Sequence, residues 1–379
     1  MFGFRGPLNR RPPEHPPDRP IRFPRGTFFL MLFMAVIAGL GALKIAASVV
    51  VPLVIAVFFA TALYPLIVFL NRRVKIPWNL SVTLVITVSF VVLGGFFLLL
   101  VSSVRMVFSA YPRYEARFLT VYQTIAGILK LPFNADNSFL SNLWDMAGMR
   151  SFIQYSAITF SNGVVAVARN LVVISLLICF LLVEMQALRE KLSLAMSGEK
   201  SRYITAILED IMGQVAKYIS VKFFISLSTG LLVFSGTMAV KLDFAIIWGF
   251  LAFALNFIPN FGSIAAGLFT FTFSILQFWP DPVRPVYVGI LMLAVNMILG
   301  NIVEPRVQGK NLGISPFLIL ASLALWGWIW GFAGMVLAVP MMVVVQFICE
   351  NVSFLRPVAI MMGSVKAAQE KAACGGGGL

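Results

Sequence analysis

The chain has 379 residues and a formal net charge of +14, with 60% apolar and only 12% charged residues. A globular domain in water carries about 25% charged residues, so this composition excludes a large soluble domain. The apolar residues also form long blocks, such as residues 80–101, which contain no charge. We therefore predict an all-α, polytopic helical membrane protein with about eight membrane segments, some of them re-entrant or interrupted by Pro and Gly.

The excess of Lys and Arg is typical of membrane proteins, whose cytoplasmic loops are positive. Aromatic residues do not alternate with these bases as a nucleic-acid stacking surface requires, so we expect no nucleic-acid partner. Cys179, Cys349 and Cys374 have no paired spacing, and the single histidine, His15, lies in a Pro-rich stretch. This pattern suggests no zinc site and no histidine-based catalysis, so we expect no metal, no cofactor and no enzymatic activity.

Changes in polarity divide the chain into seven regions. The first holds seven prolines and six arginines, and a segment of that composition neither forms a helix nor has apolar surface to bury. The predicted regions are a disordered basic cytoplasmic arm (1–26), the first three membrane segments (27–101), an extracytoplasmic region of amphipathic helices (102–158), the fourth membrane segment (159–184), cytoplasmic helices (185–218), C-terminal membrane segments with interrupted helices (219–350) and a cytoplasmic tail (351–379).

Positive residues predict the orientation in the membrane. The cluster Arg72, Arg73 and Lys75 is expected on the cytoplasmic side, and we place both termini there, in a multi-pass protein of the inner (plasma) membrane. If the chain turns at Pro259, later bases also fall on the cytoplasmic side. The apolar stretch 317–345 must then enter and leave on one side, as a hairpin that turns near Gly331.

The first candidate site is the interruption near residue 259. Pro259 removes an amide donor, and Gly262 permits unusual backbone angles. Asn256 and Asn260 are four residues apart, so they share a face if this segment is helical. Secondary transporters place substrate and ion sites at such interruptions, and the alternative is a simple turn at the membrane interface.

The second candidate site surrounds Glu304, the acid best placed to titrate or to bind a cation. Arg306 and Lys310 offer the alternative of pairing with Glu304 and leaving it structural. Pro305 is expected to break the helix there. Lys222 lies among apolar residues, where it either serves the solute pathway or extends toward the lipid headgroups.

The third feature is the sequence Trp326-Gly327-Trp328-Ile329-Trp330-Gly331, followed by Gly334. Gly331 and Gly334 are expected to break the helix or to let two helices approach closely. The tryptophans are more typical of a packing or interfacial cluster than of a substrate cage.

The order and spacing of several motifs resemble those of the AI-2E transporter family across residues 28–350. The resemblance is carried by Tyr218 to Ser226 with Gly230, Pro259 to Gly262, Glu304-Pro305-Arg306, the Trp-Gly sequence above, and Gly334 to Pro340. It implies cytoplasmic termini and export of small molecules. Some members of the family are linked to a furanone-type quorum signal and others to sodium/proton exchange.

We therefore predict a secondary transporter that exports a small solute, with a quorum-signal-like molecule as the candidate. The alternatives are a sodium (or other cation)/proton antiporter and, in another class, a membrane scaffold without transport activity. The sequence lacks the phosphate-binding loop of ATPases and the Gly-x-Ser-x-Gly and His-Glu-x-x-His motifs of hydrolases. The expected partners are a small molecule or ion, the lipid bilayer and further copies of the chain in a homo-oligomer of unknown order.

Overall fold

A computed structural model describes residues 25–128, 169–185, 187, 191, 194, 198–308, 314–351 and 355–363. Within these ranges the chain is helical apart from short connections and one isolated antiparallel bridge between Ile314 and Gly363. Six of the described helices are long and apolar enough to cross a membrane. The predicted class, an all-α polytopic membrane protein, is confirmed.

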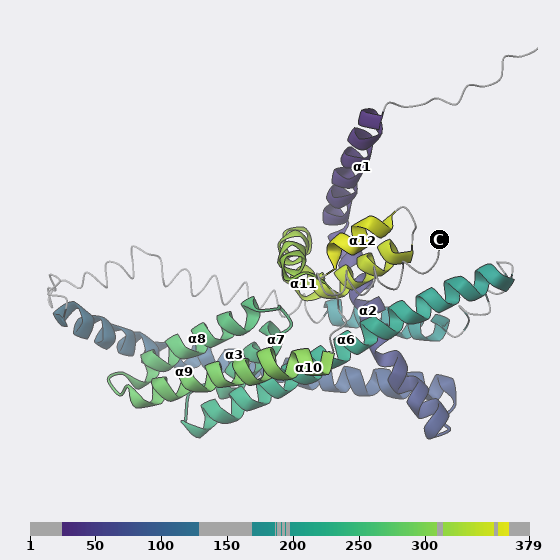
Figure 1. Cartoon of the computed structure of the whole chain (residues 1–379). Helices are drawn as coiled ribbons and strands as arrows, with labels where there is room; N and C mark the ends of the chain where they lie inside the picture. The colour runs from purple at the N-terminus through teal and green to yellow at the C-terminus, as the bar shows by residue number, and fades with distance from the viewer. Residues whose placement is uncertain are drawn as a thin grey trace, which may run out of the picture. The chain divides into compact units, whose positions relative to one another are not determined.

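The chain divides into two units, Met1–Ala46 and Ala47–Leu379, which are described separately (Figure 1). The first contains α1 (Arg25–Ile45); residues 1–24 of the expected arm lie outside the described residues. The second unit contains α2 (Ala47–Arg73), α3 (Trp78–Ile128), a helix over residues 169–185, α6 (Gly198–Ala239), α7 (Ala245–Leu255), α8 (Phe261–Phe278), α9 (Val283–Val295), the π-helix η1 (Asn296–Val303), α10 (Glu304–Gln308), α11 (Pro316–Asn351) and α12 (Arg356–Met362).

Three helices of the second unit form one apolar cluster. Ala56, Ala60 and Ile67 of α2 pack with Val82 and Val85 of α3 and with the helix over residues 169–185. Burial of such side chains contributes about 25 cal/mol per Å² of apolar surface removed from water; in a bilayer, close packing takes over much of that role. This cluster fixes α2 beside its two neighbours.

Two helices run through boundaries that the change in polarity predicts. α3 has 51 residues and continues past residue 101, and α6 has 42 residues and continues past residue 218. The expected boundaries at 102 and 219 therefore lie inside helices, because a helix can leave the apolar layer without changing its backbone conformation. The extracytoplasmic place of residues 102–158 stays a prediction, and residues 129–158 lie outside the described part.

The C-terminal half of α3 contacts the connection after α6 and the last turn of α8. Tyr114 Oη donates a hydrogen bond to Asp243 Oδ2 at 2.5 Å, and Arg117 Nη1 donates to the Gln277 carbonyl oxygen at 2.5 Å. Asp243 lies between α6 and α7, and its N–H donates to Gln277 Oε1 at 2.8 Å. These bonds join α3 to the C-terminal ends of α6 and α8.

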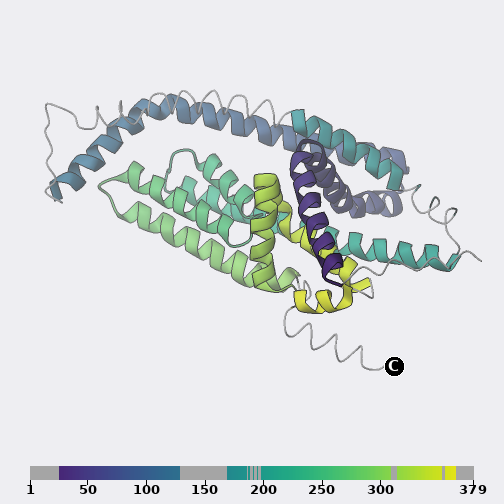
Figure 2. The same cartoon turned by 90° about the horizontal axis from the view of Figure 1, so that it is seen from above.

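α6 is the helix around which the second unit is organised. It contacts α2, α7, α9, η1, α10 and α11. In Figures 1 and 2, α9 and α10 lie in line with each other along one side of α6. Val233 of α6, Ala252 of α7, Ala266 of α8 and Val295 of α9 meet in one buried cluster, so these four helices are held together by apolar packing around α6.

α11 is a hairpin of two helical arms, and α12 closes its base. Ser322 Oγ in the first arm donates to the Ala338 carbonyl oxygen in the second arm at 2.9 Å. Cys349 of α11 packs against Ala359 and Met362 of α12. The region 351–379, predicted as a tail, therefore contains a helix that packs back on α11; residues 352–354 and 364–379 lie outside the described part.

Candidate functional site

A row of polar side chains lies along one face of α6. Residues three or four apart share a face of an α-helix, and four polar residues at that spacing are buried: Tyr218, Lys222, Ser226 and Thr229. Burial of a polar group is unfavourable unless it finds a partner. The partners of this face therefore identify the site.

The partner of Lys222 is Glu304, which is 82 residues further along the chain. Lys222 Nζ lies 2.6 Å from Glu304 Oε1, and the two side chains are 4% and 18% exposed. Gln308, one turn after Glu304 in α10, donates a second hydrogen bond from Nε2 to the same oxygen at 3.1 Å. A cation from α6 and an amide from α10 thus hold this carboxylate largely out of solvent.

This geometry decides between alternatives that the sequence leaves open. The extension of Lys222 to the headgroups is wrong, because its side chain is buried against Glu304. The pairing of Glu304 with Arg306 is also wrong: Arg306 is exposed, and within the described part of the chain Lys222 is the base paired with Glu304. Lys310 lies outside the described residues.

The buried pair is energetically sensitive. Two charges lose their hydration when they are buried, and their mutual attraction compensates only while both are present. Removal of one partner from such a pair typically destabilises a protein by about 3–5 kcal/mol. Charged groups within membrane segments are rare and usually mark ion or substrate pathways. Lys222 and Glu304 together are therefore the strongest candidate for a functional group in the described chain.

A π-helix positions Glu304. η1 covers Asn296–Val303, and the Glu304 N–H donates to the Leu299 carbonyl oxygen, five residues back. π-turns are rare and frequently occur at functional sites, because the wider turn changes the direction of the side chains that follow. The expected break at Pro305 is wrong in form: the chain stays helical across Pro305, and the irregularity is the π-turn before it.

The interruption near residue 259 is a turn between α7 and α8. A Cβ atom on Gly262 would lie 1.6 Å from the Leu255 carbonyl oxygen, so only glycine fits this close approach. Asn260 is exposed, with φ 63°, ψ −52°, whereas Asn256 is buried and donates from Nδ2 to Ser226 Oγ at 3.0 Å. The two asparagines do not share a helical face, because α7 ends at Leu255.

The turn therefore reaches the α6 polar face through one residue. Ser226 lies one helical turn after Lys222, so Asn256 joins the same face as the ion pair. Pro259, which stands between Asn256 and Gly262, is half-buried and forms part of the turn itself. Of the candidates near residue 259, Asn256 is the one whose side chain belongs to the site.

The predicted hairpin in α11 is confirmed as a fold. Gly331 has φ 61°, ψ −137°, a conformation almost restricted to glycine. A Cβ atom on Gly334 would lie 1.9 Å from the Trp326 carbonyl oxygen, which requires glycine where the arms meet. The ring centroids of Trp326 and Trp330 are 4.8 Å apart, which agrees with a packing cluster.

The first arm of the hairpin is short for a membrane span. Residues 316–330 rise about 22 Å at 1.5 Å per residue, less than the hydrocarbon thickness of about 30 Å. α7, with 11 residues, is shorter still. Helices of these lengths end inside an apolar layer rather than cross it, and backbone interrupted there needs protein or a water-filled cavity beside it.

Three residues of the site were not predicted from the sequence. Tyr218 and Ser226 lie four residues before and after Lys222, and Gln308 lies four residues after Glu304. That spacing was the available signal, because side chains one turn from a buried charge share its face. A search for polar residues one turn from each candidate charge would have found all three.

Discontinuous helices around a buried charge pair define a class of protein. They are the features of polytopic membrane transport proteins, in which interrupted helices and buried charges line the pathway. The family of the chain agrees with that class. Residues 28–354 match the AI-2E transporter family, and the chain belongs to that family.

Individual relatives cover most of the chain. It is 33% identical over 328 residues to a "Putative transport protein" of Borreliella burgdorferi, which covers 86% of this chain and 88% of that protein. It is 30% identical over 350 residues to a "Putative transport protein" of Haemophilus influenzae, covering 89% and 96%. It is 28% identical over 341 residues to the AI-2 transport protein TqsA of Escherichia coli (strain K12), covering 89% and 95%.

Proposed function

We propose that this membrane transport protein is a secondary transporter that exports a small polar solute, and that opening of the Lys222–Glu304 pair couples an ion to solute movement. The observation that carries the proposal is the burial of this pair directly after the π-helix. If Glu304 takes a proton or a cation, its attraction for Lys222 weakens and the contact between α6 and α10 loosens. The two helices then have two arrangements that an ion gradient can bias.

The name of one relative supports a solute class. The Escherichia coli relative is an AI-2 transport protein. On that basis we propose that this chain also transports a quorum-signal-like solute. The positive cluster at Arg72, Arg73 and Lys75, which is exposed between α2 and α3, supports cytoplasmic placement of that connection. We accordingly propose the inner membrane, with both termini in the cytoplasm. The homo-oligomer stays a prediction.

A second candidate function is cation/proton antiport. Glu304 is a largely buried carboxylate whose oxygen already binds one cationic group, the Lys222 ammonium. A site of this kind can exchange that ammonium for sodium or for a proton without any organic solute. In this alternative the same two residues act, and the transported species is the ion itself.

A flux experiment distinguishes these functions. The full chain is reconstituted into proteoliposomes, and AI-2 uptake or release is measured under imposed proton and sodium gradients, with sodium flux followed in parallel. We expect gradient-dependent AI-2 flux that Glu304→Gln abolishes. Glu184→Gln is the matched control, because Glu184 pairs with Lys191 at the surface, where its side chain is 60% exposed. It should transport as the wild type does.

A charge exchange separates a coupling role from a structural one. Lys222→Glu combined with Glu304→Lys restores an ion pair but removes the acid from the end of the π-helix. We expect near-native thermal stability and no flux. If this variant or Glu304→Gln transports normally, the pair is structural and the proposal is wrong. Sodium flux without AI-2 flux supports the antiporter, and a folded wild type with neither flux supports the scaffold.

A further inference from the structure

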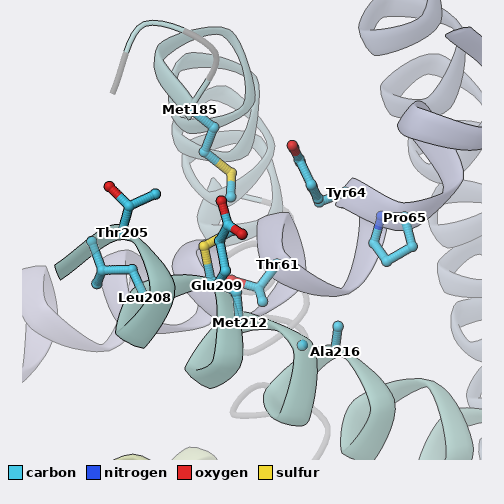
Figure 3. Close-up of a pocket in the computed structure, with 10 residues that line it drawn as sticks. Thr61, Tyr64, Pro65, Met185, Thr205, Leu208, Glu209, Met212 and Ala216 are labelled. Carbon is cyan, nitrogen blue, oxygen red and sulfur yellow. The ribbon is translucent and has the colours of Figure 1, made fainter. Parts of the chain in front are cut away.

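A separate cavity lies between α2, the helix over residues 169–185 and the N-terminal half of α6 (Figure 3). Its volume is about 240 Å³, larger than a cavity of about 150 Å³ that holds benzene. The lining residue of α6 nearest Lys222 in sequence is Ala216, about 9 Å before it along the helix. The cavity is therefore distinct from the ion-pair site.

The walls of the cavity are mostly apolar, and the cavity opens sideways. Pro65, Met185 and Met212 contribute apolar surface, and methionine adapts readily to the shape of a bound molecule. Pro65 and Gly213 are exposed, and α2 is long and apolar enough to cross a membrane, so lipid acyl chains lie beside this opening. Glu209 also lines the cavity but already interacts with another group of the chain. A flexible acyl chain can therefore enter from the side.

An aromatic contact places the cavity near a membrane surface. Tyr64 lines the cavity from α2, and its ring centroid lies 5.9 Å from that of Trp78 at the start of α3. Tryptophan and tyrosine are enriched at membrane–water interfaces. The positive cluster of Arg72, Arg73 and Lys75 stands between these two aromatic residues in sequence and is exposed. The cavity is therefore within reach of the lipid headgroups at this surface.

A stripe on α2 connects the cavity to the positive cluster. Pro65, Phe69 and Arg72 are four and three residues apart, so they share one face of the helix, and all three are exposed. Arg72 lies about 10 Å beyond Pro65 along the helix axis. Among the described residues, no carboxylate pairs with Arg72, Arg73 or Lys75. These bases are therefore available to an anionic headgroup, which attracts Lys and Arg near the membrane surface.

We infer that the cavity and the positive cluster together bind one anionic glycerophospholipid. One acyl chain occupies the cavity and runs past Phe69, and the phosphate lies at Arg72 and Arg73. A zwitterionic lipid has the same chains but gains less from the bases, because its phosphate charge is balanced within its own headgroup. The inference goes beyond the proposed function, because it involves neither Lys222 nor Glu304.

Two lipids with the same chains test the headgroup preference. Native mass spectrometry of the full-length protein in detergent micelles measures binding of dioleoylphosphatidylglycerol, which is anionic, and dioleoylphosphatidylcholine, which is zwitterionic. We expect the first molecule of the anionic lipid to bind about tenfold more tightly. Arg72→Gln with Arg73→Gln should remove most of this preference. Arg113→Gln with Arg284→Gln removes the same charge at two other exposed arginines and should leave it unchanged.

Two results of this comparison would overturn the inference. One is equal affinity for the two lipids, and the other is a preference that survives the loss of Arg72 and Arg73. Glycerol 3-phosphate, which carries the phosphate without acyl chains, should not displace the anionic lipid at equal concentration. Displacement would show that a free phosphate compound is the ligand, and the assignment to a lipid would then be wrong.

A space-filling variant tests the place of the acyl chain. Gly213 lines the cavity, and a Cβ atom there meets no atom within 4 Å, so Gly213→Leu occupies free space without a clash. Leu is also the better helix former, so the melting temperature should not fall. We expect the first molecule of either lipid to bind about tenfold more weakly, because the acyl chain loses apolar contact. Unchanged lipid binding in Gly213→Leu would overturn the inference.

Discussion

Two ion pairs of this chain have the same residue types in opposite environments. Lys191 and Glu184 are seven residues apart and about three-fifths exposed, at 62% and 60%. Lys222 and Glu304 come from distant helices and are 4% and 18% exposed. Exposed pairs contribute about 0–1 kcal/mol to stability, whereas removal of one member of a buried pair leaves an uncompensated charge. Burial, rather than the presence of charge, distinguishes the site from an ordinary surface contact.

The largest effect is expected when one member of the buried pair is removed. Lys222→Met keeps an unbranched side chain, one heavy atom shorter, and leaves Glu304 without its cation. We expect a loss of about 3–5 kcal/mol in the free energy of unfolding, measured by denaturation in nanodiscs. Lys191→Met is the control at the exposed pair and should change the same quantity by less than about 1 kcal/mol. Equal losses in both variants would remove the distinction between the pairs.

Replacement of both members sharpens the comparison. Lys222→Met with Glu304→Leu removes both charges and fills their space with apolar atoms. Such replacements are often neutral or stabilising by about 1–4 kcal/mol, so the double variant should recover most of the stability that Lys222→Met loses. Flux in proteoliposomes should stay absent. A double variant as unstable as the single one would mean that the pair holds the fold together.

The bond between Tyr114 and Asp243 lies between these extremes, because both residues are half-buried. Tyr114→Phe removes the hydroxyl that donates to Asp243 Oδ2 at 2.5 Å. A hydrogen bond to a charged group contributes about 1.5–3 kcal/mol, and we expect the lower end because solvent reaches this bond. This contribution is measured as the difference in unfolding free energy between the wild type and the variant. Tyr287→Phe, at an exposed tyrosine, should leave that free energy unchanged.

The same bond predicts a dependence on alkaline pH. Burial, and then the hydrogen bond to Asp243, raise the pKa of Tyr114 well above its ordinary value. The unfolded chain therefore releases this proton first, near pH 10, so stability falls as the pH rises above about 10. Tyr114→Phe should make that fall shallower in denaturation curves collected across this range. An identical slope in wild type and variant would contradict the assignment.

A smaller effect is expected for the neutral pair on the same face of α6 as Lys222. Asn256 Nδ2 donates to Ser226 Oγ at 3.0 Å, and both side chains are buried. A double-mutant cycle with Asn256→Ala and Ser226→Ala should give a coupling of about 1 kcal/mol. A coupling near zero would show that the α7–α8 turn is not joined to α6 through this bond.

The smallest effect concerns the exposed pair itself. Glu184→Gln should change the unfolding free energy by about 0.5 kcal/mol or less. The difference from wild type should vanish in 1 M salt, where the screening length is about 3 Å. The loss caused by Lys222→Met should persist there, because buried charges are screened much less. Salt titration of both variants checks the contrast, and equal salt sensitivity would contradict it.

The sequence was most informative where the backbone must break. Gly331 and the segment from Pro259 to Gly262 predicted the α11 hairpin and the α7–α8 turn, because proline and glycine act on the chain locally. Lys222, Glu304 and Asn256 were also candidates from their types alone. Their grouping was not predictable, because it depends on the rotation of α6 against a helix 82 residues away.

Two features escaped prediction for other physical reasons. The π-turn of η1 is defined by which backbone carbonyl oxygen accepts each N–H bond, such as that of Leu299. The apolar residues around it have no distinct composition that would signal this pattern. The continuity of α3 past residue 101 and of α6 past residue 218 was missed because polarity reports the environment of a helix. Helix termini are set instead by caps and by proline or glycine.

The closure at the base of α11 has a practical consequence. The Ser315 N–H donates to the Met362 carbonyl oxygen at 3.0 Å, and Ile314 pairs with Gly363, so the chain before α11 is bonded to the chain after α12. The two arms of α11 and α12 are therefore held together at the base of the hairpin. A fluorescent reporter attached beyond Gly363 would therefore report displacement of this base without a label on either arm.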